Sequence, residues 1–311
     1  MILTVTPNPA FEKTVFIAEL RPGEDHRAKD YTVAAGGKGC NVARAVRCLG
    51  GEARAIVLAG GPTGEQVVAT LREQDGVEVA PVWTRGMTRT ITTVREPKGR
   101  QTAFFEPGPA ITEAEHQALL ATVARELPRA QALTLSGSVP DTSLNGLYAS
   151  CIQLARAAGV PVLLDSYGAP FAEGLRARPD VAKGNTAEVG SYTQKQIQTN
   201  ADIAATAYML SKLAHTAAII TKDTHGYWYV TPLGGVHVSA LPIEAVNAVG
   251  SGDAVLAAWA MGLAGDWPFE QTARLAAAAG AANAEQLGLC QFTRARVDEL
   301  AAQVRLTPYD V

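Results

Sequence analysis

The sequence predicts an α/β fold: a three-layer α/β/α core with a mainly parallel sheet, together with a small β-sheet lid. Two observations predict it. Short apolar runs alternate with longer helix-like segments along most of the chain, and this strand–helix–strand order is typical of a parallel sheet covered by helices on both faces. A Thr-rich stretch at 88–94 interrupts that order and indicates strands that belong to a second sheet.

The core elements follow from local patterns. Residues 2–6 form an apolar run that ends at a Pro-Asn-Pro break, which predicts a strand. Residues 39–49 place apolar side chains at spacings of three and four, which predicts a helix. Thr112 and Glu115 form a capping box, in which a hydroxyl and a carboxylate satisfy free backbone amides at a helix start. The same criteria predict strands at 55–59, 77–82, 132–135, 162–164 and 216–220, and helices at 64–74, 112–127, 145–158, 253–264, 269–285 and 293–304.

The predicted lid comes from strand-like segments with no helix between them. A turn signal at 96–99 joins two of them into a β-hairpin. We expect the segments to form a small antiparallel sheet, built from about 11–35 and 86–107, that closes over a site at the strand ends; the alternative is an extra sheet with no moving role. Since no internal repeat or linker is visible, residues 1–311 are expected to form one domain with this lid. The strand-like segments lie at 14–17, 31–34, 88–94 and 101–105.

Composition and charge exclude several classes of protein. The 27 Lys and Arg against 30 Asp and Glu give a formal net charge of −3, so non-specific nucleic-acid binding, which depends on phosphate neutralisation, is not expected. The longest apolar stretch, 254–265, has about 12 residues against the roughly 20 that cross a bilayer, so we expect no membrane contact. Four cysteines without a CxxC pair argue against a disulfide scaffold and a zinc knot. The N-terminus lacks the pattern of a secretion signal, so a cytoplasmic location is expected.

A glycine-rich turn that leads into an apolar helix is the strongest chemical signal. Gly250, Ser251 and Gly252 are expected to expose backbone N–H groups at a helix start, where the helix dipole favours phosphate. Asp253 stands at the edge of this site, and a carboxylate there can take a proton from a hydroxyl that attacks phosphorus. The alternative is that Asp253 only caps the helix.

A second glycine-rich loop, at 36–41, also precedes a helix. It is not a P-loop, because Gly39 follows Lys38 where a Ser or Thr would be needed. It also fails the dinucleotide fingerprint, because Val42 occupies the third glycine position. We expect its backbone amides, Lys38 and Asn41 to approach a small polar ligand; the alternative is a plain helix start.

Two weaker signals lie at predicted strand ends. Asn185 and Glu188 form an Asn-x-x-Glu motif, and their oxygens suit Mg²⁺, usually through water. The segment 136–138, Ser-Gly-Ser, ends a strand at the position where open α/β sheets bind ligands. The five histidines show no metal-ligand spacing, and the sequence has no Gly-x-Ser-x-Gly elbow, so an α/β serine hydrolase is disfavoured.

Taken together, these motifs resemble the PfkB-type branch of the ribokinase-like carbohydrate kinases over nearly the whole chain. The resemblance is greatest to the group that contains 1-phosphofructokinase, tagatose-6-phosphate kinase and the minor bacterial 6-phosphofructokinase. Segments 36–44 and 249–253 are similar to the two signatures of the family. The other landmarks, in family order, lie at 6–10, 60–64, 88–89, 106–109, 136–140 and 183–188.

The resemblance implies a ribokinase-like kinase that uses ATP and Mg²⁺ to phosphorylate a hydroxyl of a hexose phosphate: fructose 1-phosphate, fructose 6-phosphate or tagatose 6-phosphate. It implies Asp253 as the base, and the amides of Gly250, Ser251 and Gly252 as the anion hole for the transferring phosphoryl group, since such transfer depends mainly on positioning. Dimerisation through the lid is a further family expectation. The other implied residues are Asn185 and Glu188 for Mg²⁺ and phosphates, Thr221, Gly226 and Asn283 for the nucleotide, and Glu12, Gly37, Lys38, Asn41, Arg89 and Ser138 for the sugar or its phosphate.

Several positions depart from the family pattern and leave the substrate open. Glu12 replaces the usual Asp, Ile91 and Thr93 replace an Asn and a Lys in the lid strand, and Asp223 replaces a Gly on the nucleotide side. The missing Lys would be a natural partner for a sugar phosphate. The alternatives are therefore a kinase of an unphosphorylated sugar, polyol or nucleoside on the same fold, or a ligand-binding relative that has lost efficient chemistry.

Overall fold

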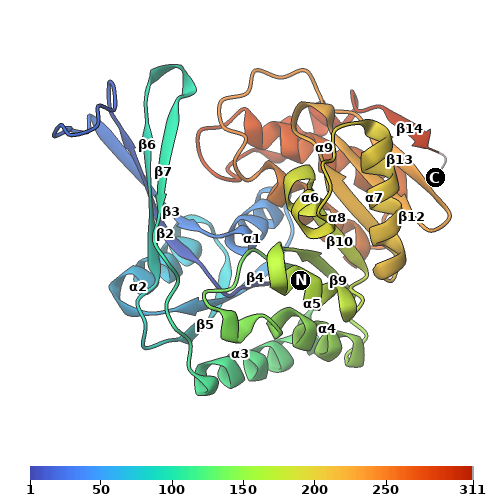
Figure 1. Cartoon of the computed structure of the whole chain (residues 1–311), viewed down its shortest axis with the longest axis horizontal. Helices are drawn as coiled ribbons and strands as arrows, with labels where there is room; N and C mark the ends of the chain where they lie inside the picture. The colour runs from blue at the N-terminus through green and yellow to red at the C-terminus, as the bar shows by residue number, and fades with distance from the viewer. Residues whose placement is uncertain (310–311) are drawn as a thin grey trace.

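The computed structural model describes residues 1–309, with the side chain of Lys98 excepted, and the strands form two separate sheets (Figure 1). The larger sheet contains β1 (Ile2–Thr6), β4 (Ala53–Ala59), β5 (Glu78–Trp83), β8 (Ala132–Ser136), β9 (Val162–Asp165), β10 (Val181–Asn185), β11 (Ala217–Thr221), β12 (Tyr227–Thr231), β13 (Gly234–Val238) and β14 (Leu306–Tyr309). Their order is β14-β13-β12-β11-β10-β9-β8-β1-β4-β5. Every neighbouring pair from β11 to β5 is parallel, and the pairs among β11, β12, β13 and β14 are antiparallel.

Helices cover both faces of the larger sheet, because its strands bury side chains alternately to either side. In β11, Ala217 and Ile219 join one apolar core, whereas Ala218 and Ile220 join the other. The first core is completed by α1 (Lys38–Cys48), α2 (Gly61–Ala69), α8 (Ser251–Ala264), α9 (Phe269–Ala284) and α10 (Arg294–Ala301). The second is completed by α3 (Glu113–Glu126), α4 (Leu147–Ala157), α5 (Gly168–Arg176), α6 (Thr186–Thr193) and α7 (Asn200–Leu213). The predicted three-layer arrangement is confirmed.

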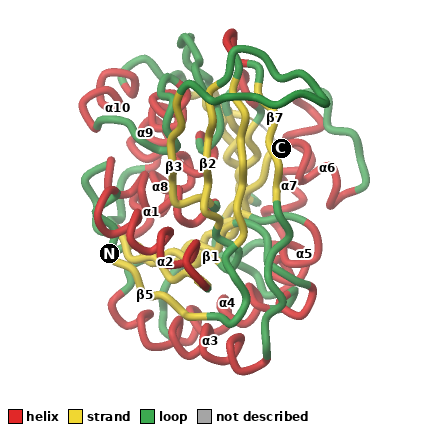
Figure 2. The backbone as a smooth tube through the Cα atoms, turned by 90° about the vertical axis from the view of Figure 1, so that its left-hand side faces the viewer, coloured by secondary structure: helices red, strands yellow, loops and turns green. Residues whose placement is uncertain are grey.

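The smaller sheet, which we call the lid sheet, contains β2 (Ala10–Phe16), β3 (Asp30–Gly36), β6 (Arg89–Arg95) and β7 (Gln101–Phe105) in the order β3-β2-β6-β7 (Figure 2). The predicted segments therefore do form one sheet. The prediction that it is antiparallel is wrong for the central pair, because β2 and β6 run parallel. The chain passes through α1, β4, α2 and β5 between these two strands, which allows β6 to enter the sheet in the same direction as β2.

Most predicted core elements are present within a few residues of their expected limits. The helix predicted at 64–74 is the main exception, because α2 ends at Ala69 and a π-helical turn, Thr70–Gln74, follows. Strands β12, β13 and β14 and helices α5, α6 and α7 were not predicted. Strand β13 begins with Gly234-Gly235, residues that disfavour strands, and it is held by pairing with β12 and β14. Among residues 1–309, no helix has both the length and the apolar character that a membrane span requires.

Polar residues gather where the parallel strands end. Neighbouring strands stay in register, so that Ser136 pairs with Asp165 and Asn185 pairs with Thr221. Because parallel strands place their carboxyl ends at one edge of the sheet, these side chains come from distant segments and lie along the same edge. Strand β2 follows β1 after the short 7–9 segment, and this places the lid sheet beside that edge (Figure 1).

Candidate active site

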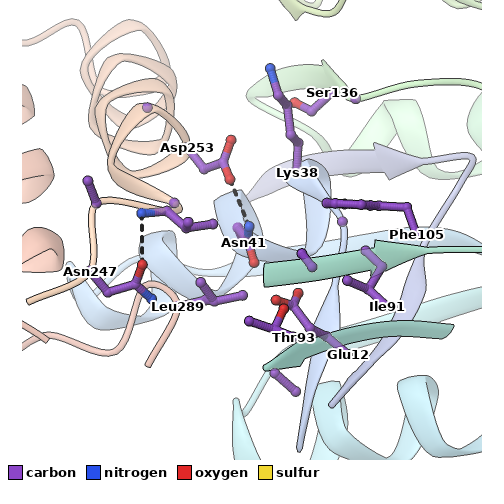
Figure 3. A pocket seen from close by; sticks show the side chains of 18 of the residues that line it. Glu12, Lys38, Asn41, Ile91, Thr93, Phe105, Ser136, Asn247, Asp253 and Leu289 are labelled. Carbon is purple, nitrogen blue, oxygen red and sulfur yellow. Dashed lines mark hydrogen bonds between the residues drawn. The ribbon is translucent and has the colours of Figure 1, made fainter. Parts of the chain in front are cut away.

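A cavity of about 610 Å³ lies between the lid sheet and the carboxyl edge of the larger sheet (Figure 3). The lid strand β6 contributes alternate residues to it, so this Thr-rich strand does have a two-residue periodicity. Loops that follow the parallel strands and the starts of α1 and α8 form the opposite wall. The residues that line it include Glu12, Arg89, Ile91, Thr93, Arg95 and Phe105 from the lid sheet, and Gly37, Lys38, Asn41, Ser138, Asn185, Glu188, Thr221, Gly250, Gly252 and Asp253 from the core.

Asp253 lies in the first turn of α8 and is almost completely buried. Asn41 from α1 donates a hydrogen bond from Nδ2 to Asp253 Oδ2 at 2.8 Å (Figure 3). The helix N-cap is Gly250, and no side-chain hydrogen bond caps the helix there. Asp253 therefore is not the cap of its own helix, and its carboxylate is directed to the cavity wall, where Asn41 holds one oxygen.

The surroundings of Asp253 tune its acidity. Burial has the largest effect and raises the pKa of Asp253 to about 6, and the negative charge of Asp165 acts in the same direction. Lys38, Lys183 and the hydrogen bond from Asn41 lower that pKa. A pKa near 6 leaves the carboxylate mostly deprotonated at neutral pH, and makes it a stronger base than an exposed aspartate.

Arg44 fixes the orientation of the Asn41 amide. Its Nη1 donates to Asn41 Oδ1 at 3.0 Å, and because a guanidinium only donates, the amide nitrogen must face Asp253. Arg44 is buried, forms an ion pair with Asp75 at 2.7 Å, and donates to the Ala35 carbonyl at 2.9 Å. Sequence reasoning did not identify Arg44; its signal is an arginine three residues after Asn41 on a helix, where the two side chains share a face.

The loop before α8 offers free backbone donors. The N–H groups of Gly250, Gly252 and Asp253 have no hydrogen-bond partner among residues 1–309, whereas that of Ser251 donates to Ala248 O at 3.1 Å. The structure therefore leaves two of the three predicted amides available and adds the amide of Asp253. These donors lie at the positive end of a helix dipole, where an anion is favoured.

Asn283 lies behind this loop and does not line the cavity. Its Nδ2 donates to Val249 O and to Ser251 Oγ, both at 2.9 Å, and its Oδ1 accepts from Cys290 N–H at 2.7 Å. The side chain is fully buried, and these three bonds engage both ends of its amide. Asn283 was predicted to border the nucleotide, but in the structure it supports the loop that carries the free donors.

Two lysines and two carboxylates form a network beside Asp253. Asp165, at the end of β9, is fully buried and accepts hydrogen bonds from Lys38 Nζ at 2.8 Å and from Lys183 Nζ at 2.6 Å. Lys38 also forms an ion pair with Glu188 at 2.7 Å. Burial by itself lowers the pKa of Lys38, but Asp165 and Glu188 outweigh it and hold that pKa above its usual range. The network therefore keeps the Lys38 ammonium charged at the cavity wall.

Asp165 and Lys183 are functional candidates to which the sequence assigned no role, although Lys183 begins the family landmark at 183–188. Asp165 follows a predicted strand, and that position at the sheet edge was its only signal. Lys183 lies against the loop that carries the free backbone donors, since a Cβ added to Gly252 would be 3.1 Å from Lys183 Nζ. Burial raises the pKa of Asp165, but the two lysines outweigh it and hold that pKa below its usual range, so the carboxylate is ionised and keeps both ammonium groups in place.

Asn185 and Glu188 cap helix α6. Asn185 Oδ1 accepts from the Glu188 N–H at 2.9 Å, and Glu188 Oε2 accepts from the Asn185 N–H at 2.9 Å, which is a capping box. The other Glu188 oxygen holds Lys38. Both residues line the cavity, but no group of three or more His, Cys, Asp or Glu side chains suited to a metal is present in the described part of the chain.

A second cavity, of about 570 Å³, lies beside the first and has mostly apolar walls. Thr221 and Gly226, two residues that the resemblance assigns to the nucleotide, both line it. Gly226 has φ +87°, and a Cβ there would lie 2.0 Å from Val238 O, so the turn requires glycine. The residues that line both cavities are Thr221, Asp223, Ala248 and Gly252.

The lid side of the first cavity carries one carboxylate, Glu12, and two guanidinium groups, Arg89 and Arg95. Burial raises the pKa of Glu12, with Arg44 and Arg89 opposing that effect. Arg89 Nη2 donates to Asn8 O at 3.3 Å, and Asn8 Nδ2 donates to Ser138 Oγ at 3.0 Å. The structure thus brings the predicted residues Glu12, Arg89 and Ser138 to one end of the cavity.

Gly37 forms the turn that starts α1 beside this group. It has φ +112°, and a Cβ there would lie 2.9 Å from Thr6 Cγ2, so a side chain would both strain and crowd the turn. The absence of a side chain lets the start of α1 approach the end of β1, which places Lys38 and Asn41 on the cavity wall.

A three-layer α/β core, a lid sheet, a buried carboxylate and free amides at a helix start together define a kinase site of the sugar-kinase type. Comparison with known proteins agrees: residues 10–295 match the pfkB family of carbohydrate kinases. The chain belongs to this family, and it is a carbohydrate kinase.

Several relatives of known name cover almost the whole chain. It is 30% identical over 307 residues to ATP-dependent 6-phosphofructokinase isozyme 2 of Mycobacterium tuberculosis, a match that covers 97% of this chain and 90% of that protein. It is 27% identical to 1-phosphofructokinase of Bacillus subtilis over 99% of each chain. The crystal structure of phosphofructokinase-2 from Escherichia coli in complex with potassium matches with a TM-score of 0.90 at 26% identity, over 97% of this chain and 98% of that chain.

Proposed function

We propose that this protein transfers the terminal phosphoryl group of ATP to a hydroxyl of a hexose phosphate, with Asp253 as the general base. The observation that carries the proposal is the arrangement around Asp253: a buried carboxylate, oriented by Asn41, lies in the same helical turn as the free amides of Gly250 and Gly252. A base and an anion site side by side are what attack of a hydroxyl on a phosphoryl group requires.

In this mechanism each group has one task. The acceptor hydroxyl lies between Asp253 and the lid sheet, and the carboxylate takes its proton as the oxygen attacks phosphorus. Asn41 holds one carboxylate oxygen at 2.8 Å and leaves the other for the hydroxyl. The amides of Gly250, Gly252 and Asp253 stabilise the charge on the transferring group, and such donors contribute most when they are already in place. Lys183 lies against the same loop and adds positive charge.

The cavities fit ATP and Mg²⁺. The apolar cavity suits the base and sugar of the nucleotide, and the wall that it shares with the first cavity leads to the free amides. Asn185 and Glu188 would hold Mg²⁺ mainly through water, because both Glu188 oxygens already accept hydrogen bonds and Mg²⁺ commonly keeps several waters. When bound, Mg²⁺ neutralises negative charge on the phosphates.

Arg89 supports an acceptor that already carries a phosphate. It extends from the lid sheet into the cavity near Glu12, and its pKa is lowered, chiefly by burial. A phosphate on the acceptor would supply the negative charge that a partly buried guanidinium needs nearby. Arginine can bind such a phosphate through two parallel hydrogen bonds. The relatives named above are phosphofructokinases, which favours fructose 1-phosphate and fructose 6-phosphate as the proposed acceptors. Tagatose 6-phosphate is proposed with them, because the family resemblance of the sequence implies it.

A second candidate acceptor is an unphosphorylated sugar, polyol or nucleoside. Ile91 and Thr93 occupy the middle of the lid wall, with Phe105 beside them (Figure 3). These side chains carry no positive charge, so the central part of the lid offers a neutral and partly apolar surface to the acceptor. A ligand-binding relative with little chemistry is the third candidate.

A panel of these sugars and sugar phosphates, with coupled detection of ADP, separates the three candidates. The expected result is turnover with a hexose phosphate, and a kcat lower by about 10²–10⁴ in Asp253→Asn with ATP affinity within about twofold of wild type. Turnover confined to unphosphorylated acceptors supports the second candidate, and no ADP release with any acceptor supports the third. Full activity in Asp253→Asn would contradict the assignment of the base.

We also propose that the chain acts as one kinase domain and dimerises through the lid sheet. Tyr31 and Phe104 support this, since they expose 59% and 56% of their surface on that sheet. Analytical ultracentrifugation of wild type and of a Tyr31→Ser, Phe104→Ser double variant tests it. A dimer in wild type and a monomer in the variant are expected, and a wild-type monomer at micromolar concentration would contradict the proposal.

A further inference from the structure

The wall shared by the two cavities has a negative charge. Only four described residues line both cavities: Thr221, Asp223, Ala248 and Gly252. This inference rests on the proposed function. The phosphoryl donor is a nucleoside triphosphate with its nucleobase in the apolar cavity and its terminal phosphate at the amides of Gly250 and Gly252. Its phosphate chain must therefore lie along this wall. Asp223 therefore faces the most strongly charged part of the donor.

Asp223 has no ion-pair partner among the described side chains. Its side chain is exposed, and it forms no ion pair within 4 Å and no side-chain hydrogen bond with any of them. The adjacent Lys222 is not its ion-pair partner, because its Nζ is held by a hydrogen bond to the carbonyl of Gln198 at 2.7 Å. Lys38 and Lys183, the nearby cations of the first cavity, are already paired with Asp165. Asp223 thus keeps an uncompensated charge beside the phosphate path.

The other groups on this path do not distinguish a free nucleotide from its metal complex. Backbone amides attract any phosphate oxygen, and Thr221 and Ala248 are uncharged. A carboxylate does distinguish the two, because it repels the free triphosphate more strongly than a triphosphate whose charge is largely offset by a divalent cation. We propose that Asp223 is a specificity-determining residue of the donor site: it selects the divalent-cation complex of the nucleoside triphosphate and disfavours the uncomplexed polyanion.

Binding measurements with the full chain test this without any turnover. Isothermal titration calorimetry would use ATP with excess Mg²⁺ and ATP with excess EDTA, on wild type and on Asp223→Asn. Asparagine has the same shape and also tolerates the left-handed backbone of position 223, where φ is +32°. We expect Asp223→Asn to bind uncomplexed ATP about tenfold more tightly than wild type does, and to change the Kd for MgATP by less than about twofold. The gain for uncomplexed ATP should shrink at high salt.

Asp266→Asn is the matched control. Asp266 is also exposed and left-handed, with φ +50°, but it lines neither cavity, so the same loss of charge there should leave both Kd values unchanged. An unchanged ratio of the two Kd values in Asp223→Asn would overturn the inference and leave the proposed function intact. Weaker MgATP binding with unchanged binding of uncomplexed ATP would also overturn it, because Asp223 would then hold the cation. Failure of wild type to bind either form would overturn the proposed function, and this inference with it.

Discussion

Replacement of Asn41 by leucine tests the proposed base through its acidity. Leucine has nearly the shape of asparagine and removes the donor that lies 2.8 Å from Asp253 Oδ2. A hydrogen bond to a charged group contributes about 1.5–3 kcal/mol, and about 1.4 kcal/mol corresponds to one pKa unit. Asp253 is 6% exposed, so solvent screens this interaction little.

The direction of the change follows from which form the donor stabilises. The Asn41 N–H stabilises the carboxylate, so its loss favours the protonated form and raises the pKa of Asp253 from about 6 by about one to two units. A protonated Asp253 cannot accept a proton, and activity is lost as the pH falls through this pKa. The acid limb of kcat/KM should therefore move to about pH 7–8 in Asn41→Leu, with partial recovery of kcat near pH 9.

The assay is kcat and kcat/KM from pH 5 to pH 9.5 with coupled ADP detection and a saturating donor. Asn41 is also proposed to contact the acceptor, so a change of KM alone says nothing about the base. The position of the acid limb is the result that tests Asp253 as the base. Asn200→Leu, at an exposed helix start, is the control and should leave the profile unchanged. An acid limb at the wild-type position in an otherwise active Asn41→Leu would refute the reasoning.

Three further variants test the network, the acceptor site and the nucleotide turn. Asp165→Asn leaves Lys38 and Lys183 without their shared carboxylate and should reduce the free energy of unfolding by about 3–5 kcal/mol, measured by urea denaturation. Arg89→Ala should raise KM at least about tenfold for a phosphorylated acceptor with little change in kcat, measured by steady-state kinetics. Gly226→Ala should cost at least about 2 kcal/mol of stability, because its Cβ would overlap a carbonyl oxygen, measured by thermal and chemical unfolding.

Each of these has a matched comparison. Asp298→Asn removes an exposed ion pair with Arg294 and should reduce the free energy of unfolding by less than about 1 kcal/mol. An equally small reduction in Asp165→Asn would contradict the prediction that the buried network stabilises the fold. An unchanged KM in Arg89→Ala for every active acceptor would refute the phosphate contact. Gly159 has a similar φ of +70°, and no atom lies within 4 Å of a Cβ added there. A similar loss of stability in Gly159→Ala and Gly226→Ala would attribute the loss to backbone strain alone and contradict the predicted overlap at Gly226.

The sequence predicted the features that depend on near neighbours. Apolar runs and spacings of three and four gave most of the parallel strands and the helices around them, since burial on one or two faces imposes a local period. The glycine loops at 36–41 and 250–252 were recognisable because a helix start with small residues exposes backbone donors whatever surrounds it. Asp253 and Asn41 were found in the same way, each from its own loop.

Tertiary structure decided which of these residues meet. Asn41 and Asp253 are 212 positions apart, and Lys38 and Asp165 are 127 apart; only the packing of α1 against α8 and against the larger sheet brings them within hydrogen-bond distance. The position of Asn283 could not be predicted from the sequence for the same reason. Its place behind the loop depends on how α9 packs against α8.

The sequence by itself therefore determined the fold class, the glycine loops and the acid that is proposed to act as the base. Only the tertiary structure decided the parallel pairing of β2 with β6, the network around Asp165 and the exposure of Asp223 on the shared wall. The physical reason is that periodicity and turn chemistry act over a few residues. Contacts between distant segments depend instead on packing, which no single stretch of sequence specifies.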